Sequence, residues 1–259
     1  MKSIDPEKTA HQLIAFINDV FRKEGYTNAV IGVSGGIDSA ISCTLAVRAL
    51  GATHIYPVLL PYGKLNNQGT RDAQMMMKWL KIPEEHVRTV DIQPMVDAAV
   101  KTIDSAMDEG RRGNIMARMR MVVLYDLAKA MPALVVGTEN KTEHLLGYYT
   151  KFGDEASDVE PLRQLYKTQV YELARYLDIP KKILAKPPTA GLWEGQTDEG
   201  EFGFTYREVD EVLFLHFEKQ LSKEAIFQKG YKKKTTKRMW WWIEKGSFKD
   251  RVPFTPRGN

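Results

Sequence analysis

Apolar and polar residues follow two alternating patterns along the first 146 positions of the chain. Short, β-branched apolar runs at residues 29–33, 55–60, 87–92 and 133–136 predict strands, because such runs are too short for helices and are typical of strands buried on both faces. Between these runs, apolar residues recur at helical spacing and predict helices. The alternation indicates an α/β fold: a doubly wound parallel sheet with helices on both faces.

Single residues add detail to this expectation. Asp5 can cap a first helix that begins at Pro6. Pro57 lacks an N–H, so the strand at residues 55–60 is predicted to lie at or near a sheet edge, or to be bulged. The apolar face of a long helix that begins at Asn114 is expected to comprise Ile115, Met119, Val122 and Leu127.

The pattern becomes less regular after residue 146. Residues 147–161 are polar, acidic and interrupted by glycines, which is typical of a functional loop. Residues 186–199 show almost no periodicity and predict a second long loop, of the kind that is often either a lid or disordered. Between the two loops Lys167 begins a helix, and Thr205 and Glu208 have the spacing of a capping box. We expect one domain over residues 1–259.

Composition narrows the class of protein. The chain is 43% hydrophobic and 27% charged, and no apolar run has the length of a membrane span. Its single cysteine, Cys43, excludes a disulfide framework and favours a cytoplasmic location. A net charge of +4 is mild, and suits a phosphorylated small molecule as well as it suits nucleic acid.

The stretch that carries recognisable chemistry is Ser-Gly-Gly-Ile-Asp-Ser at residues 34–39, between the first predicted strand and a helix. Free N–H groups of a glycine loop and a helix N-terminus form a cradle for phosphate. The loop lacks the lysine of a Walker motif and instead contains Asp38. An acid beside phosphate requires a bridging divalent cation, which points to Mg²⁺.

Several segments together resemble the ammonia-dependent NAD synthetases. The loop at 34–39 alone resembles the wider superfamily of ATP pyrophosphatases, whereas the Thr-Lys-Phe-Gly-Asp segment at 150–154, followed by Asp158, is more specific. The resembling segments occur in family order at residues 32–39, 117–120, 137–143, 150–158, 161–167, 188–190 and 196–199. The resemblance implies the adenine nucleotide alpha hydrolase-like fold, which is Rossmann-like.

The resemblance also implies an activity and its residues. ATP would adenylate the carboxylate of nicotinic acid adenine dinucleotide (deamido-NAD), and ammonia would displace AMP to give NAD. The catalytic residues implied are Asp38, Glu143 and Lys167, of which Asp38 and Glu143 would bind Mg²⁺. ATP would contact Gly32, Val33, Ser34, Gly35, Gly36, Ile37, Asp38, Ser39, Thr138, Lys167 and Thr189. Deamido-NAD would contact Arg118, Lys151, Asp154, Asp158 and Lys249.

The resemblance sets further expectations and has one departure. Family members are homodimers, so we expect a homodimer with no nucleic-acid or membrane partner. Cys43 has no glutaminase-like sequence around it, so free ammonia is the expected nitrogen donor and no glutaminase domain is expected. The family tail typically contains His-Lys-Arg before a proline; here Phe248 replaces the histidine and only Lys249 carries over.

Two alternatives remain open. A tRNA-modifying ATP pyrophosphatase would use the basic tail with its three tryptophans at 240–242 to bind nucleic acid, although the sulfur-transferring members need more cysteines. A non-catalytic nucleotide-binding module could share the fold, although Asp38, Glu143 and Lys167 are all retained.

Overall fold

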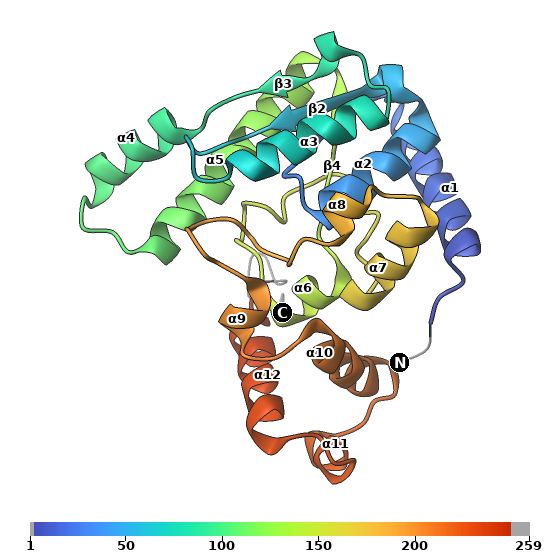
Figure 1. Ribbon diagram of the computed structural model, residues 1–259, viewed down its shortest axis with the longest axis vertical. Helices are drawn as coiled ribbons and strands as arrows, with labels where there is room; N and C mark the ends of the chain where they lie inside the picture. Colours follow the sequence, from blue (N-terminus) through green and yellow to red (C-terminus); the bar gives the residue numbers. More distant parts are fainter. Residues whose placement is uncertain (1–2, 250–259) are drawn as a thin grey trace, which may run out of the picture.

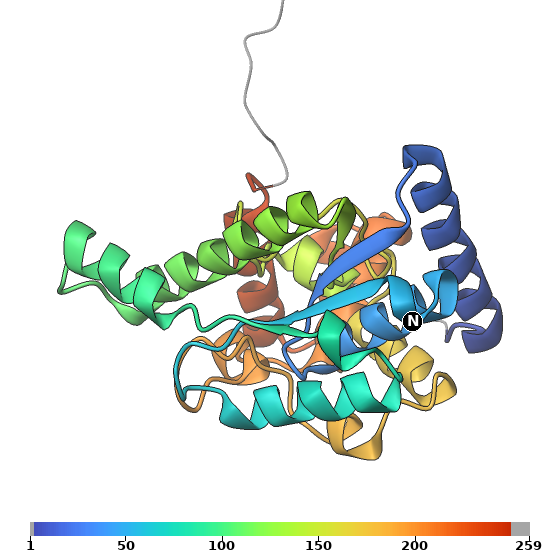
Figure 2. The same cartoon turned by 90° about the horizontal axis from the view of Figure 1, so that it is seen from above.

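Residues 3–249, which the computed structural model describes, build a parallel four-stranded sheet with helices packed on both faces (Figures 1 and 2). The strand order is β3-β2-β1-β4. The strands are β1 (Asn28–Gly32), β2 (Ile55–Leu59), β3 (Arg88–Thr89) and β4 (Ala133–Val136). The doubly wound parallel α/β fold expected from the sequence is therefore confirmed.

The position of β2 explains how the sheet accommodates a proline. β2 lies inside the sheet, next to the edge strand β3, so the expectation of a strand near an edge is confirmed. Pro57 is opposite Ile31 of β1, while pairing with β3 starts only at Val58. The third strand is much shorter than the predicted 87–92, although the N–H groups of Val90 and Ile92 still bond to carbonyls that end or follow β2.

Alternate residues of the strands face two different cores. Ala29 and Ile31 pack with α1 (Pro6–Glu24), α2 (Ile37–Leu50), α3 (Asn67–Trp79) and α7 (Lys167–Tyr176). Val30 packs on the opposite face against α5 (Glu109–Ala130). Figure 2 shows α5 on one side of the strands and α3 on the other. Burial of both faces is why β1, β2 and β4 are mostly apolar, whereas the two residues of the edge strand β3 are exposed.

The local signals at helix ends are confirmed. Asp5 accepts a hydrogen bond from the N–H of Lys8 at the start of α1. Thr205 and Glu208 form the capping box of α10 (Tyr206–Leu213), which continues into a π-helical turn at Phe214–Glu218. Among the described residues, no helix combines the length and apolarity required to cross a bilayer.

The apolar face predicted for the long helix is wrong in part. Val122 is 51% exposed, whereas Met116, Ala117 and Ala128 of α5 are buried. The first half of α5 packs against α4 (Gln93–Ile103), and the second half packs on β1 and β4. Because the neighbours of α5 change along its length, the helix does not bury the same face from end to end.

A helical layer completes the molecule at the end remote from β3 (Figure 1). It contains α10, α11 (Lys223–Gln228) and α12 (Lys233–Gly246), and α6 (Lys141–Leu146) packs against α10 and α12. Of the three adjacent tryptophans, Trp240 is buried in this layer and Trp241 is 43% exposed. Two short helices, α8 (Lys181–Leu184) and α9 (Asp198–Phe202), flank the loop before this layer.

A buried aspartate joins this layer to the helices beside the sheet. Asp210 of α10 is fully buried, and its Oδ1 accepts the Thr142 hydroxyl of α6 at 2.5 Å. Its Oδ2 accepts the N–H and hydroxyl of Thr168 in α7, each at 2.8 Å. Three donors therefore compensate the burial of one carboxylate.

We expect Asp210→Ala to lower the free energy of unfolding by about 3–5 kcal/mol, because it leaves three donors without their charged acceptor. Urea unfolding measures this loss. The control is Ala at Asp126, which is exposed on α5 and should change stability by less than about 0.5 kcal/mol. Equal stability of the two variants would show that Asp210 does not hold the layers together.

Candidate active site

A cavity of about 580 Å³ opens at the carboxyl ends of β1, β2 and β4. Ligands bind at this edge in open α/β sheets. Ten of the eleven residues predicted to bind ATP line the cavity: Gly32, Val33, Ser34, Gly36, Ile37, Asp38, Ser39, Thr138, Lys167 and Thr189. The eleventh, Gly35, is buried within the same loop.

The phosphate loop, residues 34–39, has a backbone that only glycine permits at one position. Gly35 has φ +77°, and a Cβ there would lie 2.2 Å from the carbonyl oxygen of Gly69 in the first turn of α3. The Ser34 hydroxyl accepts the Gly36 N–H at 3.2 Å and lies 3.1 Å from the Ser39 hydroxyl. These bonds fix the loop at the N-terminus of α2, where backbone N–H groups can bind phosphate.

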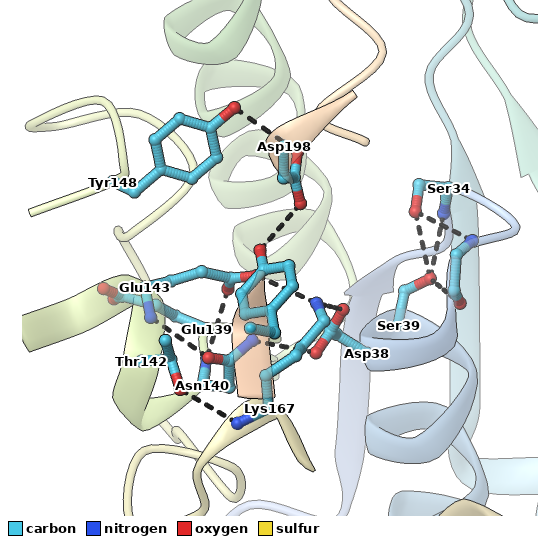
Figure 3. A network of polar contacts seen from close by, with 12 residues as sticks. Ser34, Asp38, Ser39, Glu139, Asn140, Thr142, Glu143, Tyr148, Lys167 and Asp198 are labelled. Atoms are coloured by element: carbon cyan, nitrogen blue, oxygen red, sulfur yellow. Dashed lines mark hydrogen bonds and ion pairs between the residues drawn. The ribbon is translucent and has the colours of Figure 1, made fainter. Parts of the chain in front are cut away.

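The centre of the cavity is a buried ionic cluster (Figure 3). Lys167 Nζ lies 2.6 Å from Asp38 Oδ2 and 3.0 Å from Glu143 Oε1, and the lysine side chain is 2% exposed. Asp38 comes from α2, Glu143 from α6 and Lys167 from α7. The structure thus brings together all three residues that the sequence predicted to be catalytic.

Asn140 orients the two acids. Its Nδ2 donates to Asp38 Oδ1 at 3.0 Å, while its Oδ1 accepts the N–H of Glu143 as the cap of α6. Because the Glu143 side chain also reaches the Asn140 N–H, the two residues form a capping box. One amide therefore connects the acid after β1 to the acid after β4.

Burial and charge shift the ionisation of this cluster. Burial raises the pKa of Glu143 to about 8; the Lys167 ammonium opposes this shift, and the negative charges of Asp38 and Asp198 add to it. For Lys167, burial disfavours the charged form, but Asp38 and Glu143 outweigh it and raise the pKa of the ammonium. The lysine therefore stays charged at neutral pH.

Comparison with known proteins places this arrangement in a family. A family model described as NAD synthase matches residues 9–253. The chain is 48% identical to an NH3-dependent NAD+ synthetase of Chlorobium phaeobacteroides over 84% of this chain and 77% of that one. It is 43% identical to the enzyme of the same name from Pyrococcus furiosus, over 87% and 84%.

The chain belongs to the NAD synthase family. Two solved structures resemble its fold. A structure described as NMN synthetase from Francisella tularensis is 37% identical, with a TM-score of 0.85 over 99% of this chain and 100% of that one. An NH3-dependent NAD synthetase from Campylobacter jejuni is 28% identical, with a TM-score of 0.82 over 98% and 100%.

The carboxylates of Asp38 and Glu143 are suitable ligands for a magnesium ion. Asp38 and Glu143 supply hard carboxylate oxygens on either side of one ammonium group. Across residues 3–249, no group of three or more His, Cys, Asp or Glu side chains is arranged to hold a metal. Two carboxylates suit Mg²⁺, which usually takes its other ligands from phosphate and water.

The two predicted threonines lie on separate loops. Thr138 follows β4, where a Cβ at the preceding Gly137 would lie 1.9 Å from Glu160 Oε1. The Glu160 carboxylate also accepts the Glu139 N–H, and this hydrogen bond holds the turn at residues 137–139 in place. Thr189 donates its hydroxyl to the Gln196 carbonyl at 2.7 Å, closing the loop between α8 and α9.

The residues predicted to bind deamido-NAD separate into two groups. Asp154 and Lys249 line the cavity, whereas Arg118, Lys151 and Asp158 lie outside its lining. Arg118 is exposed, and its Nε donates to the Lys151 carbonyl. Asp158 Oδ2 accepts the Val135 N–H at 2.8 Å, which gives it a structural role at β4. Their contacts with deamido-NAD stay predictions.

Arg120, Asp198, Lys186 and Asn140 belong to the site but were not assigned a role from the sequence. Arg120 donates to the Leu60 carbonyl, so it points inward while Arg118 points outward. Asp198 accepts the Tyr206 hydroxyl at 2.7 Å, and burial raises its pKa. Lys186 also lines the cavity, whereas Asn140 is fully buried outside the lining and donates to Asp38. Only Asn140 had a local signal, the spacing of a capping box with Glu143.

We expect Glu143→Gln to flatten the dependence of stability on pH. Between the ordinary carboxyl value of 4.5 and about 8, the folded protein keeps a proton on Glu143 that the unfolded chain releases, so stability falls as pH rises through this window. Urea unfolding at pH 5.5, 7 and 8.5, without metal or nucleotide, measures the slope. An identical slope in both proteins would show that Glu143 titrates normally.

Proposed function

We propose that this chain is a C–N ligase that amidates deamido-NAD with ammonia, using ATP and releasing AMP and pyrophosphate, in the cytoplasm. Membership of the NAD synthase family and relatives named NH3-dependent NAD+ synthetase support the activity. The observation that carries it in this chain is the placement of Lys167, Asp38 and Glu143 beside the phosphate loop.

The phosphate loop is proposed to hold the triphosphate of ATP through its N–H groups, with the Thr138 and Thr189 hydroxyls as further partners. Asp38 and Glu143 would hold Mg²⁺, which when bound supplies charge neutralisation at the departing pyrophosphate. Lys167 supplies a second, permanent positive charge there. Because Asp38 and Glu143 hold the Lys167 ammonium in place before ATP binds, this group needs little rearrangement during the reaction.

Two bond changes complete the proposed reaction. A carboxylate oxygen of deamido-NAD attacks the α-phosphorus of ATP, and the bond to pyrophosphate breaks. The lone pair of ammonia then attacks the activated carbonyl carbon, the C–N bond forms, a proton is released and AMP leaves with the bonding electrons. Cys43 takes no part as a nucleophile, because it is fully buried and burial raises the pKa of its thiol to about 12.

A homodimer would complete the substrate site in this proposal. Arg118, Lys151 and Asp158 lie outside the cavity of a single chain. A second copy could present its own residues to the dinucleotide from that side. The tail pattern after Lys249, at residues 250–253, lies outside the described residues.

We expect the protein to exchange labelled pyrophosphate into ATP only when deamido-NAD is present, and to form NAD and AMP when ammonium is added. Asp38→Asn should reduce the exchange at least about a hundredfold, because it removes a charge beside the leaving group. Asp126→Asn, on the exposed face of α5, is the matched control. Products ADP and phosphate would contradict an adenylate intermediate.

A second candidate is amidation of the corresponding mononucleotide. The whole-chain similarity to a structure described as NMN synthetase, at 37% identity, favours it. The tail also departs from the pattern of dinucleotide-using relatives at Phe248, whose ring lies 5.5 Å from Lys151 Nζ. The phosphate loop and the ionic cluster would serve either substrate, since the reacting carboxylate is the same.

We expect kcat/KM for deamido-NAD to exceed that for nicotinic acid mononucleotide by more than about tenfold. Initial rates with each substrate at saturating ATP and ammonium measure the ratio. A ratio that favours the mononucleotide would replace the first proposal with the second.

A further inference from the structure

A second lysine, Lys186, contacts the phosphate loop. Its Nζ donates to the carbonyl oxygen of Gly35 and to Asp72 Oδ2, each at 2.9 Å. The side chain is 28% exposed and lines the cavity, unlike Lys167, which is almost completely enclosed. Lys186 therefore joins three segments: the phosphate loop, α3 and the loop that follows α8.

The carbonyl that Lys186 holds belongs to the most constrained residue of the loop. Gly35 has φ +77° and is packed against the backbone of Gly69. A carbonyl oxygen that turned toward the cavity would repel phosphate oxygens, whereas N–H groups attract them. A hydrogen bond to an ammonium group fixes the carbonyl direction and reduces its negative potential.

Asp72 explains why the ammonium stays in place. Its carboxylate is fully buried in α3 and accepts from Gln68 Nε2 at 2.7 Å. Lys182 Nζ also contacts this carboxylate, 2.8 Å from Asp72 Oδ1. The Lys182 side chain, however, is 58% exposed and does not line the cavity. A buried carboxylate is stabilised by close positive charge, so Asp72 restrains Lys186 against Gly35.

We infer that Lys186 is a positioning residue for ATP. Held by Asp72, it fixes the Gly35 peptide so that the N–H groups of the phosphate loop face the triphosphate, and it adds a positive charge at that end of the cavity. This inference rests on the proposed function and deepens its ATP subsite.

The test compares two lysines that share one acid. We expect Lys186→Met to raise the KM for ATP about ten- to a hundredfold, the effect of losing hydrogen bonds to a charged group. Inhibition by pyrophosphate should weaken by a similar factor. The KM for deamido-NAD and the inhibition constant of adenosine, which has no phosphate, should stay within about twofold. Lys182→Met should leave all four constants within the same limit.

Other outcomes would overturn the inference. An unchanged KM for ATP, or equal losses for ATP, adenosine and deamido-NAD, would assign Lys186 a general structural role. If Lys186→Met does not fold, Lys186→Gln, which keeps a polar group beside Asp72, is measured with the same expectations. The parent protein is assayed first: absence of pyrophosphate exchange there would contradict the proposed function, whereas a changed constant in the variant alone concerns Lys186.

Discussion

The ammonium group of Lys167 is the point on which the geometry of the cavity depends. A lysine with a 2% exposed side chain loses nearly all its hydration, and this cost must be compensated by close opposite charge. Asp38 provides this charge at 2.6 Å and Glu143 adds an acceptor oxygen at 3.0 Å; both acids lie on helices that follow the neighbouring strands β1 and β4. Removing any one partner would leave an uncompensated buried charge, so folding itself assembles the reactive centre.

The charges of this centre favour a cation. Asp38, Glu143 and Asp198 are three acids near one buried lysine; burial is the main cause of the raised pKa of Glu143, and the charges of the other two acids add to it. A divalent cation that arrives with ATP would relieve the repulsion. The same cavity therefore combines an anion cradle, made of loop N–H groups, with carboxylates that a divalent cation would bridge to phosphate in the proposed reaction.

The two ends of the cavity are built differently. At the phosphate loop, close backbone contact with Gly69 and the bonds of Lys186 hold the main chain from two sides. At the other end, Asp154 and Lys249 come from a loop and from the residues after α12. The phosphate loop and the ionic cluster thus lie on or beside regular elements, whereas the predicted deamido-NAD residues Asp154 and Lys249 lie on segments that can vary without disturbing the sheet.

The sequence by itself determined the strand–helix alternation and the glycine loop at residues 34–39, because those signals are local: β-branched runs, adjacent glycines and helix caps. The roles predicted for Asp38, Glu143 and Lys167 came instead from the resemblance to the NAD synthetases. The sequence also placed Pro57 near an edge, since a missing N–H restricts pairing wherever it occurs. The tertiary structure decided the features that depend on contacts between segments far apart in the sequence. Val122 is exposed because α5 changes partners along its length, and Arg120 rather than Arg118 points into the cavity. Lys186 and Asp72 are 114 residues apart, and no local pattern announces their contact with Gly35, which arises only when α3 and the loop after α8 close around the phosphate loop.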